Sequence, residues 1–207
     1  MRSTWQWGTF SNAMHEYPAR GRRGPRRPLG RALALGAGAL LLAAARARAG
    51  VILTEKAALE RAFPGQQPER RTLYLTADQV TAVQKQARSR LPSPVVTLWE
   101  ARTDGAVTGR AYLDTHVVRT MPETVMTVVE PDGRLRMALV MQFNEPPDYL
   151  PRDRWLTTLD GKALDDDLWP GRGVHRVTGA TLTVQALTEA VRRGLAIDAV
   201  VVRGPAR

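Results

Sequence analysis

The sequence predicts an α+β fold in which an antiparallel sheet of two hairpins packs against helices in a single domain. Asp104-Gly105 and Asp132-Gly133 each separate two runs rich in β-branched and apolar residues, which is a strong hairpin signal. Amphipathic helical patterns lie before and after these runs and not between them. That order favours an antiparallel sheet over alternating β-α units.

Residues 1–49 are predicted to be an export signal. A basic region from Arg20 to Arg31 precedes an apolar run of fourteen residues, and Ala47-Arg48-Ala49 then forms an A-x-A cleavage site. Fourteen residues are short for a membrane span, which needs about 20. We expect cleavage before Gly50 and a periplasmic protein; the alternative is an uncleaved leader that anchors the chain at the membrane.

The formal net charge of +10 belongs mostly to this leader. It holds nine of the 30 cationic residues but only one of the 20 acidic ones, Glu16, which leaves residues 50–207 with a net charge of about +2. A nearly neutral body removes the main support for nucleic-acid binding. The absence of Cys excludes thiolate metal sites, iron–sulfur clusters and Cys-attached haem.

Residues 50–94 are predicted to form a helical or linker region before the sheet. A short helix is expected over 54–63, stopped by Pro64-Gly65. Thr76 and Gln79 form a capping-box pattern, and the helix that follows should run to about residue 90. Its expected apolar stripe is Val80, Val83 and Ala87.

The sheet and the C-terminal helix are expected in residues 95–207. The predicted strands are 95–102, 106–114, 124–130 and 134–143. The last strand alternates, so one set should be buried together on one face: Leu135, Met137, Leu139, Met141 and Phe143. A helix from Thr181 to about Gly194 should bury Leu182, Ala186, Leu187, Ala190 and Val191.

A short motif, Thr178-Gly179-Ala180-Thr181, stands where a Pro/Gly-rich loop meets this helix. Thr178 is expected to cap the helix through its hydroxyl. Gly179 and Ala180 leave the backbone accessible, and Thr181 projects a hydroxyl from the first turn. Free N–H groups and the helix dipole favour a phosphate there, whereas the alternative interpretation is an ordinary capped helix start.

Residues Thr178 to Thr183 resemble the flavinylation motif of the FMN-binding domain family, Asp-x-x-(Ser/Thr)-Gly-Ala-Thr-x-(Ser/Thr). This family includes the flavin-bearing subunits of the Rnf and Nqr sodium-pumping complexes. The resemblance extends from about Val95 to Ala196, and His175 stands where the family has Asp. It implies that a dedicated flavin transferase attaches FMN to Thr181 through a phosphoester. Thr183 occupies the final Ser/Thr position of the motif.

The resemblance also implies a function, that of an electron-transfer flavoprotein rather than a stand-alone enzyme. The flavin would do the redox chemistry and exchange electrons with a membrane-linked redox protein. The sequence contains no G-x-x-x-x-G-K-[ST] loop and no H-E-x-x-H motif, and we assign no catalytic residues. The alternative is an exported binding module of the same fold without covalent flavin, which His175 in place of Asp favours.

Further candidates for contacts with FMN lie beside the motif and in two other loops. Arg172, His175 and Arg176 are potential cations beside the phosphate position. His116 and Arg119, after the second predicted strand, could neutralise a phosphate or a reduced flavin; solvation or pairing with Asp or Glu is the alternative.

The loop from Asn144 to Pro151 occupies a place similar to the family's Glu-Thr-Pro-Gly loop. Pro146 and Tyr149 could therefore lie against an isoalloxazine edge, and a plain connector is the equally weighted alternative. We interpret Asp165-Asp166-Asp167 as a solvated turn rather than a metal site, because consecutive side chains point in different directions.

Overall fold

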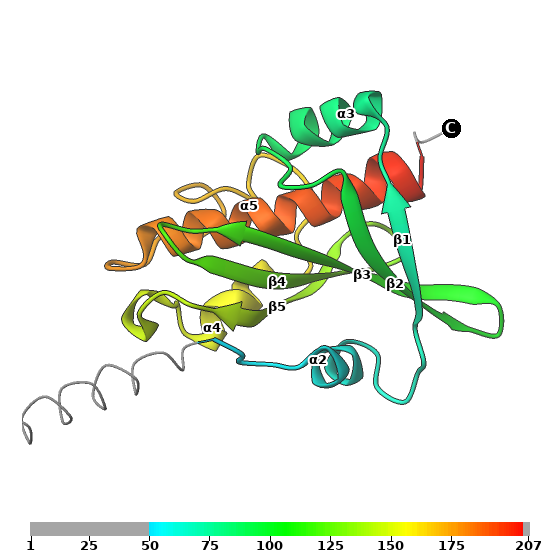
Figure 1. Ribbon diagram of the computed structural model, residues 1–207, viewed down its shortest axis with the longest axis horizontal. Helices are drawn as coiled ribbons and strands as arrows, with labels where there is room; N and C mark the ends of the chain where they lie inside the picture. The colour runs from blue at the N-terminus through cyan, green and yellow to red at the C-terminus, as the bar shows by residue number, and fades with distance from the viewer. Residues whose placement is uncertain (1–49, 205–207) are drawn as a thin grey trace, which may run out of the picture. The chain divides into compact units, whose positions relative to one another are not determined.

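The computed structural model describes residues 50–204, which belong to one compact unit of the α+β class that the sequence predicts. Five antiparallel strands follow one another in chain order (Figure 1). They are β1 (Glu69–Tyr74), β2 (Val95–Thr103), β3 (Ala106–Val117), β4 (Pro122–Val129) and β5 (Leu135–Phe143). The helices are α2 (Glu55–Ala62), α3 (Ala77–Ala87), α4 (Asp153–Leu156) and α5 (Thr181–Ile197). Short 3-10 turns cover Pro147–Tyr149 (η1) and Thr157–Leu159 (η2), and a π-helical turn over Asp198–Val202 (η3) prolongs α5.

The hairpin turn predicted at Asp104-Gly105 and the capping box predicted at Thr76 and Gln79 are confirmed. Asp104 and Gly105 both have positive φ, which a two-residue turn between twisted strands requires. Thr76 and Gln79 form both hydrogen bonds of the capping box at the start of α3. That helix ends at Ala87, three residues earlier than expected, because Arg88 adopts a left-handed conformation with φ of 54°.

The first strand, β1, was not predicted from the sequence. It pairs with β2 from Glu69 opposite Glu100 to Tyr74 opposite Val95, at the edge of the sheet. Its side chains are mostly polar and exposed, so they lack the alternation that marks a half-buried strand. Residues 50–94 thus contribute a strand and two helices to the same compact unit as the sheet.

Each face of the sheet carries its own hydrophobic core. Helices α3 and α5 cover one face, where Val83, Leu98, Tyr112, Val125 and Leu187 are buried together (Figure 1). Helix α2 covers the other face with Ala58, Ala62 and Phe63 against Trp99 and Met126. The close approach of α5 to the sheet requires Gly194, since an added Cβ would lie 2.8 Å from the side chain of Thr127 on β4.

The prediction for β5 is wrong in one respect, because its five apolar residues do not share a face. Leu135 and Phe143 pack on the α5 side, whereas Met137, Leu139 and Met141 pack on the α2 side. The register with β4 shifts twice, so that Arg136 and Met141 are extra residues on β5. Each β-bulge reverses the alternation, which a strict period of two in the sequence cannot reveal.

The prediction for α5 is also wrong at its first turn. Leu182, expected on the buried face, is 51% exposed, whereas Leu187, Ala190 and Val191 are buried as predicted. In the same turn Thr183 and Val184 are each 1% exposed, so the buried face of α5 begins with these two residues and does not include Leu182. Within residues 50–204, no helix is long and apolar enough to cross a membrane.

Candidate functional site

A shallow cavity of about 150 Å³ lies at the start of α5. It brings together the motif and residues from two other loops, the turn between β3 and β4 and the segment after β5. The lining residues are Arg119, Tyr149, Gly179, Ala180, Thr181, Leu182 and Thr183. Six of these seven were candidates from the sequence; the structure adds Leu182.

The helix that forms the cavity has no side-chain cap, so the prediction that Thr178 caps it is wrong. Ala180 occupies the N-cap position and makes no side-chain hydrogen bond. A turn closed by the bond from Ala180 N to Val177 O holds Thr178 away from the helix, with Gly179 at φ of 84°. Within the described residues, the N–H groups of Thr181, Leu182 and Thr183 have no backbone or side-chain acceptor.

Because Thr178 does not cap α5, replacing it by alanine should change stability little. We expect Thr178→Ala to alter the free energy of unfolding by no more than about 0.5 kcal/mol, as for an ordinary surface substitution. A true capping threonine would cost about 0.5–2 kcal/mol instead. Urea unfolding can separate these outcomes if Thr76→Ala, which removes the observed capping box of α3, is measured as the matched control.

Arg119 is the cation that the structure places in this cavity. Its guanidinium lies over the ring of Tyr149, 4.7 Å from the centroid, which fixes a long side chain beside the motif. A charge beside uncapped helix N–H groups gives the cavity two independent sources of positive potential. The arrangement therefore suits an anion, and a planar phosphate-bearing ligand could also use the exposed apolar side chains nearby, Val117, Met121 and Leu182.

Glu145 fixes the turn that carries Arg119. Its Oε1 accepts hydrogen bonds from Thr120 N at 2.8 Å, Met121 N at 3.1 Å and the Thr120 hydroxyl at 3.3 Å. These backbone N–H groups, that of Thr120 above all, hold the pKa of Glu145 below its ordinary value. Sequence reasoning missed this role because the acceptor and the donors lie about 25 residues apart.

Loss of the Glu145 charge should loosen the Arg119 turn in a pH-dependent way. A carboxylate with a depressed folded pKa contributes stability above its unfolded pKa of about 4.3 and loses it as the pH falls through the folded pKa. We therefore expect Glu145→Gln to lower the thermal midpoint at neutral pH. The difference from the wild type should shrink below about pH 4. A constant difference from pH 3 to 7, measured by circular dichroism, would contradict this assignment.

His116 lies outside the cavity, paired with acids as the alternative interpretation proposed. Its Nδ1 is 2.8 Å from Asp114 Oδ1 and its Nε2 is 3.1 Å from Glu123 Oε2. Arg193 of α5 donates two hydrogen bonds to Asp114, at 2.6 and 2.8 Å. His116 and Arg193 line a neighbouring cavity of about 310 Å³, which shares Leu182 with the first.

The remaining candidates are not gathered at the motif cavity. Arg172 is exposed and bound to Asp166 at 2.8 Å, and the Arg176 side chain lies against Gly171. His175 is exposed, and its carbonyl accepts a hydrogen bond from Trp155 Nε1. Pro146 is exposed before η1 and does not line the cavity.

The acidic run behaves as a turn. Asp165 Oδ1 accepts from the N–H groups of Asp167 and Leu168, and Asp166 pairs with Arg88 and Arg172. Between residues 50 and 204 there is no cluster of three or more His, Asp or Glu that could hold a metal ion.

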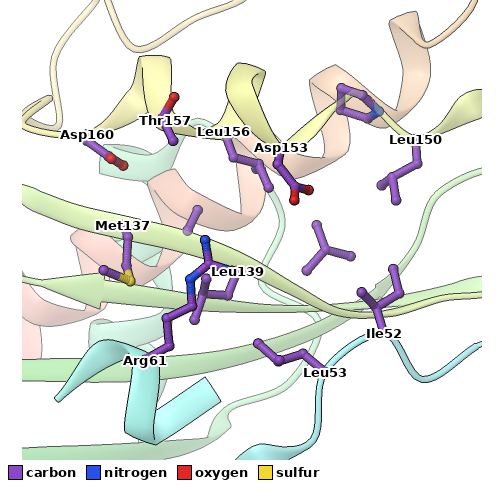
Figure 2. A pocket seen from close by; sticks show the side chains of 13 residues that line it. Ile52, Leu53, Arg61, Met137, Leu139, Leu150, Asp153, Leu156, Thr157 and Asp160 are labelled. Atoms are coloured by element: carbon purple, nitrogen blue, oxygen red, sulfur yellow. The ribbon is translucent and has the colours of Figure 1, made fainter. Parts of the chain in front are cut away.

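A separate cavity of about 150 Å³ lies between β5, α2 and α4, at the outer edge of the sheet (Figure 2). Figure 2 shows Arg61 reaching over an apolar floor that includes Met137 and Leu139, with Asp153 and Asp160 across from it. None of the candidate residues from the sequence lines this cavity. Its apolar floor and scattered charges show no nucleophile paired with a base.

Within residues 50–204, the motif cavity thus combines an exposed threonine hydroxyl, unpaired helix N–H groups and a fixed cation. A scan of protein-family models finds no match to this chain, and a search of curated proteins finds none either.

Proposed function

We propose that the chain is an exported electron-transfer flavoprotein domain that carries FMN covalently on Thr181. The observation that carries the proposal is the uncapped start of α5, where an exposed threonine hydroxyl stands beside free N–H groups and Arg119. A phosphodiester at this hydroxyl would find hydrogen-bond donors, the helix dipole and a guanidinium.

The size of the cavity supports covalent rather than enclosed binding. Ligand pockets that retain a cofactor by enclosure usually measure about 300–1,000 Å³, whereas this cavity of about 150 Å³ suits a phosphate and the atoms next to it. The ring system would then lie over the surface, against Tyr149 and exposed apolar side chains such as Leu182. An exposed ring is accessible to a redox partner, which fits a relay better than a substrate-converting enzyme.

The residues divide into distinct roles around such a group. Thr181 would provide the ester oxygen, and the first-turn N–H groups and Arg119 would hold the phosphate oxygens. Thr183 is 1% exposed, so its hydroxyl is a poor acceptor for a transferase. The helix terminus favours an anion by only about 0.3–1 kcal/mol at an exposed site, so a dedicated flavin transferase must form the bond. When bound, FMN would supply the redox chemistry.

The intact mass of the protein from its native host tests the proposal. A mass increased by one FMN moiety, retained after denaturation, is the expected result. An unmodified mass would favour the second candidate, an exported binding module of the same fold. The exposed His175, in place of the acidic residue of the motif, is the observation behind that candidate.

A further inference from the structure

The face of the sheet beneath α5 contains a buried charge cluster that the anion site does not use. Asp114 and His116 come from β3, Glu123 from β4 and Arg193 from α5. His116 and Glu123 are directly opposite in the β3–β4 register, so the strand pairing itself brings the ring against the carboxylate. The four groups form a row of contacts in which His116 lies between the carboxylates of Asp114 and Glu123.

At the Glu123 end of this row of contacts, one carboxylate oxygen lacks a hydrogen-bond partner within residues 50–204. Glu123 is 0% exposed, and its Oε1 has no hydrogen-bond partner among the described residues. The Arg193 guanidinium binds both oxygens of Asp114, so Glu123 depends on His116 alone. A buried carboxylate with a single partner is costly in its ionised form, whereas its neutral form loses little by lacking a second partner.

The titration of the pair follows from these contacts. Burial raises the pKa of Glu123, and the bond from His116 offsets this only in part. Burial alone would lower the pKa of His116, but Asp114 and Glu123 raise it above the ordinary value. The charged or titratable groups that contact the ring or line its cavity are, by element, Asp114 on β3, Glu123 on β4, Glu189 and Arg193 on α5, and Arg90 before β2.

The cluster is adjacent to the motif. The cavity onto which His116 opens is also lined by Val118, next to Arg119, and by Leu182, next to Thr181. Leu182 lines the motif cavity as well, so the two cavities meet at the first turn of α5. A negative charge added near Thr181 would therefore act electrostatically on the His116–Glu123 pair from the adjoining cavity.

We propose that the His116–Glu123 pair takes up a proton from solvent when reduction adds negative charge at the flavin site, an inference that rests on the proposed function. Two electrons from the redox partner and one proton on N5 of the ring leave one added negative charge. A second proton, bound by the pair, balances it. Two electrons are then accompanied by two protons, and the charge of the site as a whole is unchanged.

The wild-type flavinylated protein can test this directly. The pKa of His116 would be measured by NMR of the histidine rings, with FMN oxidised and with FMN reduced by dithionite. We expect the apparent pKa of the pair, followed at the His116 ring, to rise on reduction. The same value in both redox states would overturn the inference. This measurement needs no variant and does not depend on electron-transfer activity.

A second measurement counts protons. The dependence of the midpoint potential on pH gives the protons bound per two electrons. At a pH above the N1 pKa of the reduced ring, where the ring itself binds one proton, the count should exceed one in the wild type. Glu123→Gln should lower the count toward one. Glu189→Gln, which removes an acid of the same cavity that does not contact His116, should leave it unchanged. A wild-type count in Glu123→Gln would also overturn the inference.

The two proposals fail in different ways. Protein without an added FMN mass overturns both. Protein that carries FMN but shows no redox-linked change at His116 overturns only the proton uptake and leaves the proposed function intact.

Discussion

Replacing Thr181 by alanine is expected to abolish covalent FMN attachment completely while the domain remains folded. The ester requires a hydroxyl at this position, and alanine provides none. The side chain of Thr181 is exposed at the first turn of α5, and alanine is the best helix former, so the free energy of unfolding should change by no more than about 0.5 kcal/mol. Coexpression with the cognate flavin transferase, followed by a denaturing gel viewed under blue light, measures the covalent flavin.

The chain offers a matched control for this experiment. Thr178 is a second exposed threonine, three residues earlier, that neither caps α5 nor lines the cavity. Thr178→Ala should keep at least part of the fluorescence, any reduction reflecting recognition by the transferase. Fluorescence that persisted in Thr181→Ala would place the attachment elsewhere and contradict our assignment.

Removing the carboxylate of Asp198 should have the largest effect on stability. Asp198 is fully buried where α5 passes into η3, and it accepts a hydrogen bond of 2.9 Å from the Tyr112 hydroxyl. Its other partners are Arg110 at 3.3 Å and Arg203 at 2.6 Å. Asp198→Ala leaves the buried Tyr112 phenol without its acceptor and removes one of the two acidic partners of Arg110, whose bond to Glu100 at 2.9 Å remains. We therefore expect a loss of about 3 kcal/mol, the lower end of the range for a broken buried ion pair.

Chemical unfolding of Asp198→Ala, Asp198→Asn and Arg203→Ala would show how much of the lost stability comes from each partner of Asp198. Asp198→Asn keeps an acceptor for Tyr112 and loses the charge, so it should fall between the wild type and Asp198→Ala. Arg203→Ala removes the more exposed partner and should cost no more than about 1 kcal/mol. Losses of similar size in Asp198→Ala and Arg203→Ala would mean that the buried side of the network contributes little.

The sequence by itself determined the fold class, the turns and most element boundaries, because these depend on neighbouring residues. Asp104-Gly105 specifies a two-residue turn through its own backbone preferences. Thr76 and Gln79 satisfy each other within one helical turn. The position of Thr181 at the start of a helix is likewise local, since it follows from the small residues before it and the apolar period after it.

Only the tertiary structure decided which side chains share a face or a site. The bulges in β5 depend on its pairing with β4, so no pattern within β5 could divide Met137 from Leu135. The lack of a side-chain cap on α5 follows from the turn over Val177–Ala180, which holds the Thr178 hydroxyl away from the helix.

The composition of the site was likewise decided by distant contacts. Arg119 reaches the motif because Glu145, about 25 residues later in the chain, holds its turn. His116 is excluded from the motif cavity because the strand register places it against Glu123 and α5 supplies Arg193 to Asp114. Local preferences act over a few residues, whereas each of these choices depends on the free energy of groups brought together by the packed sheet.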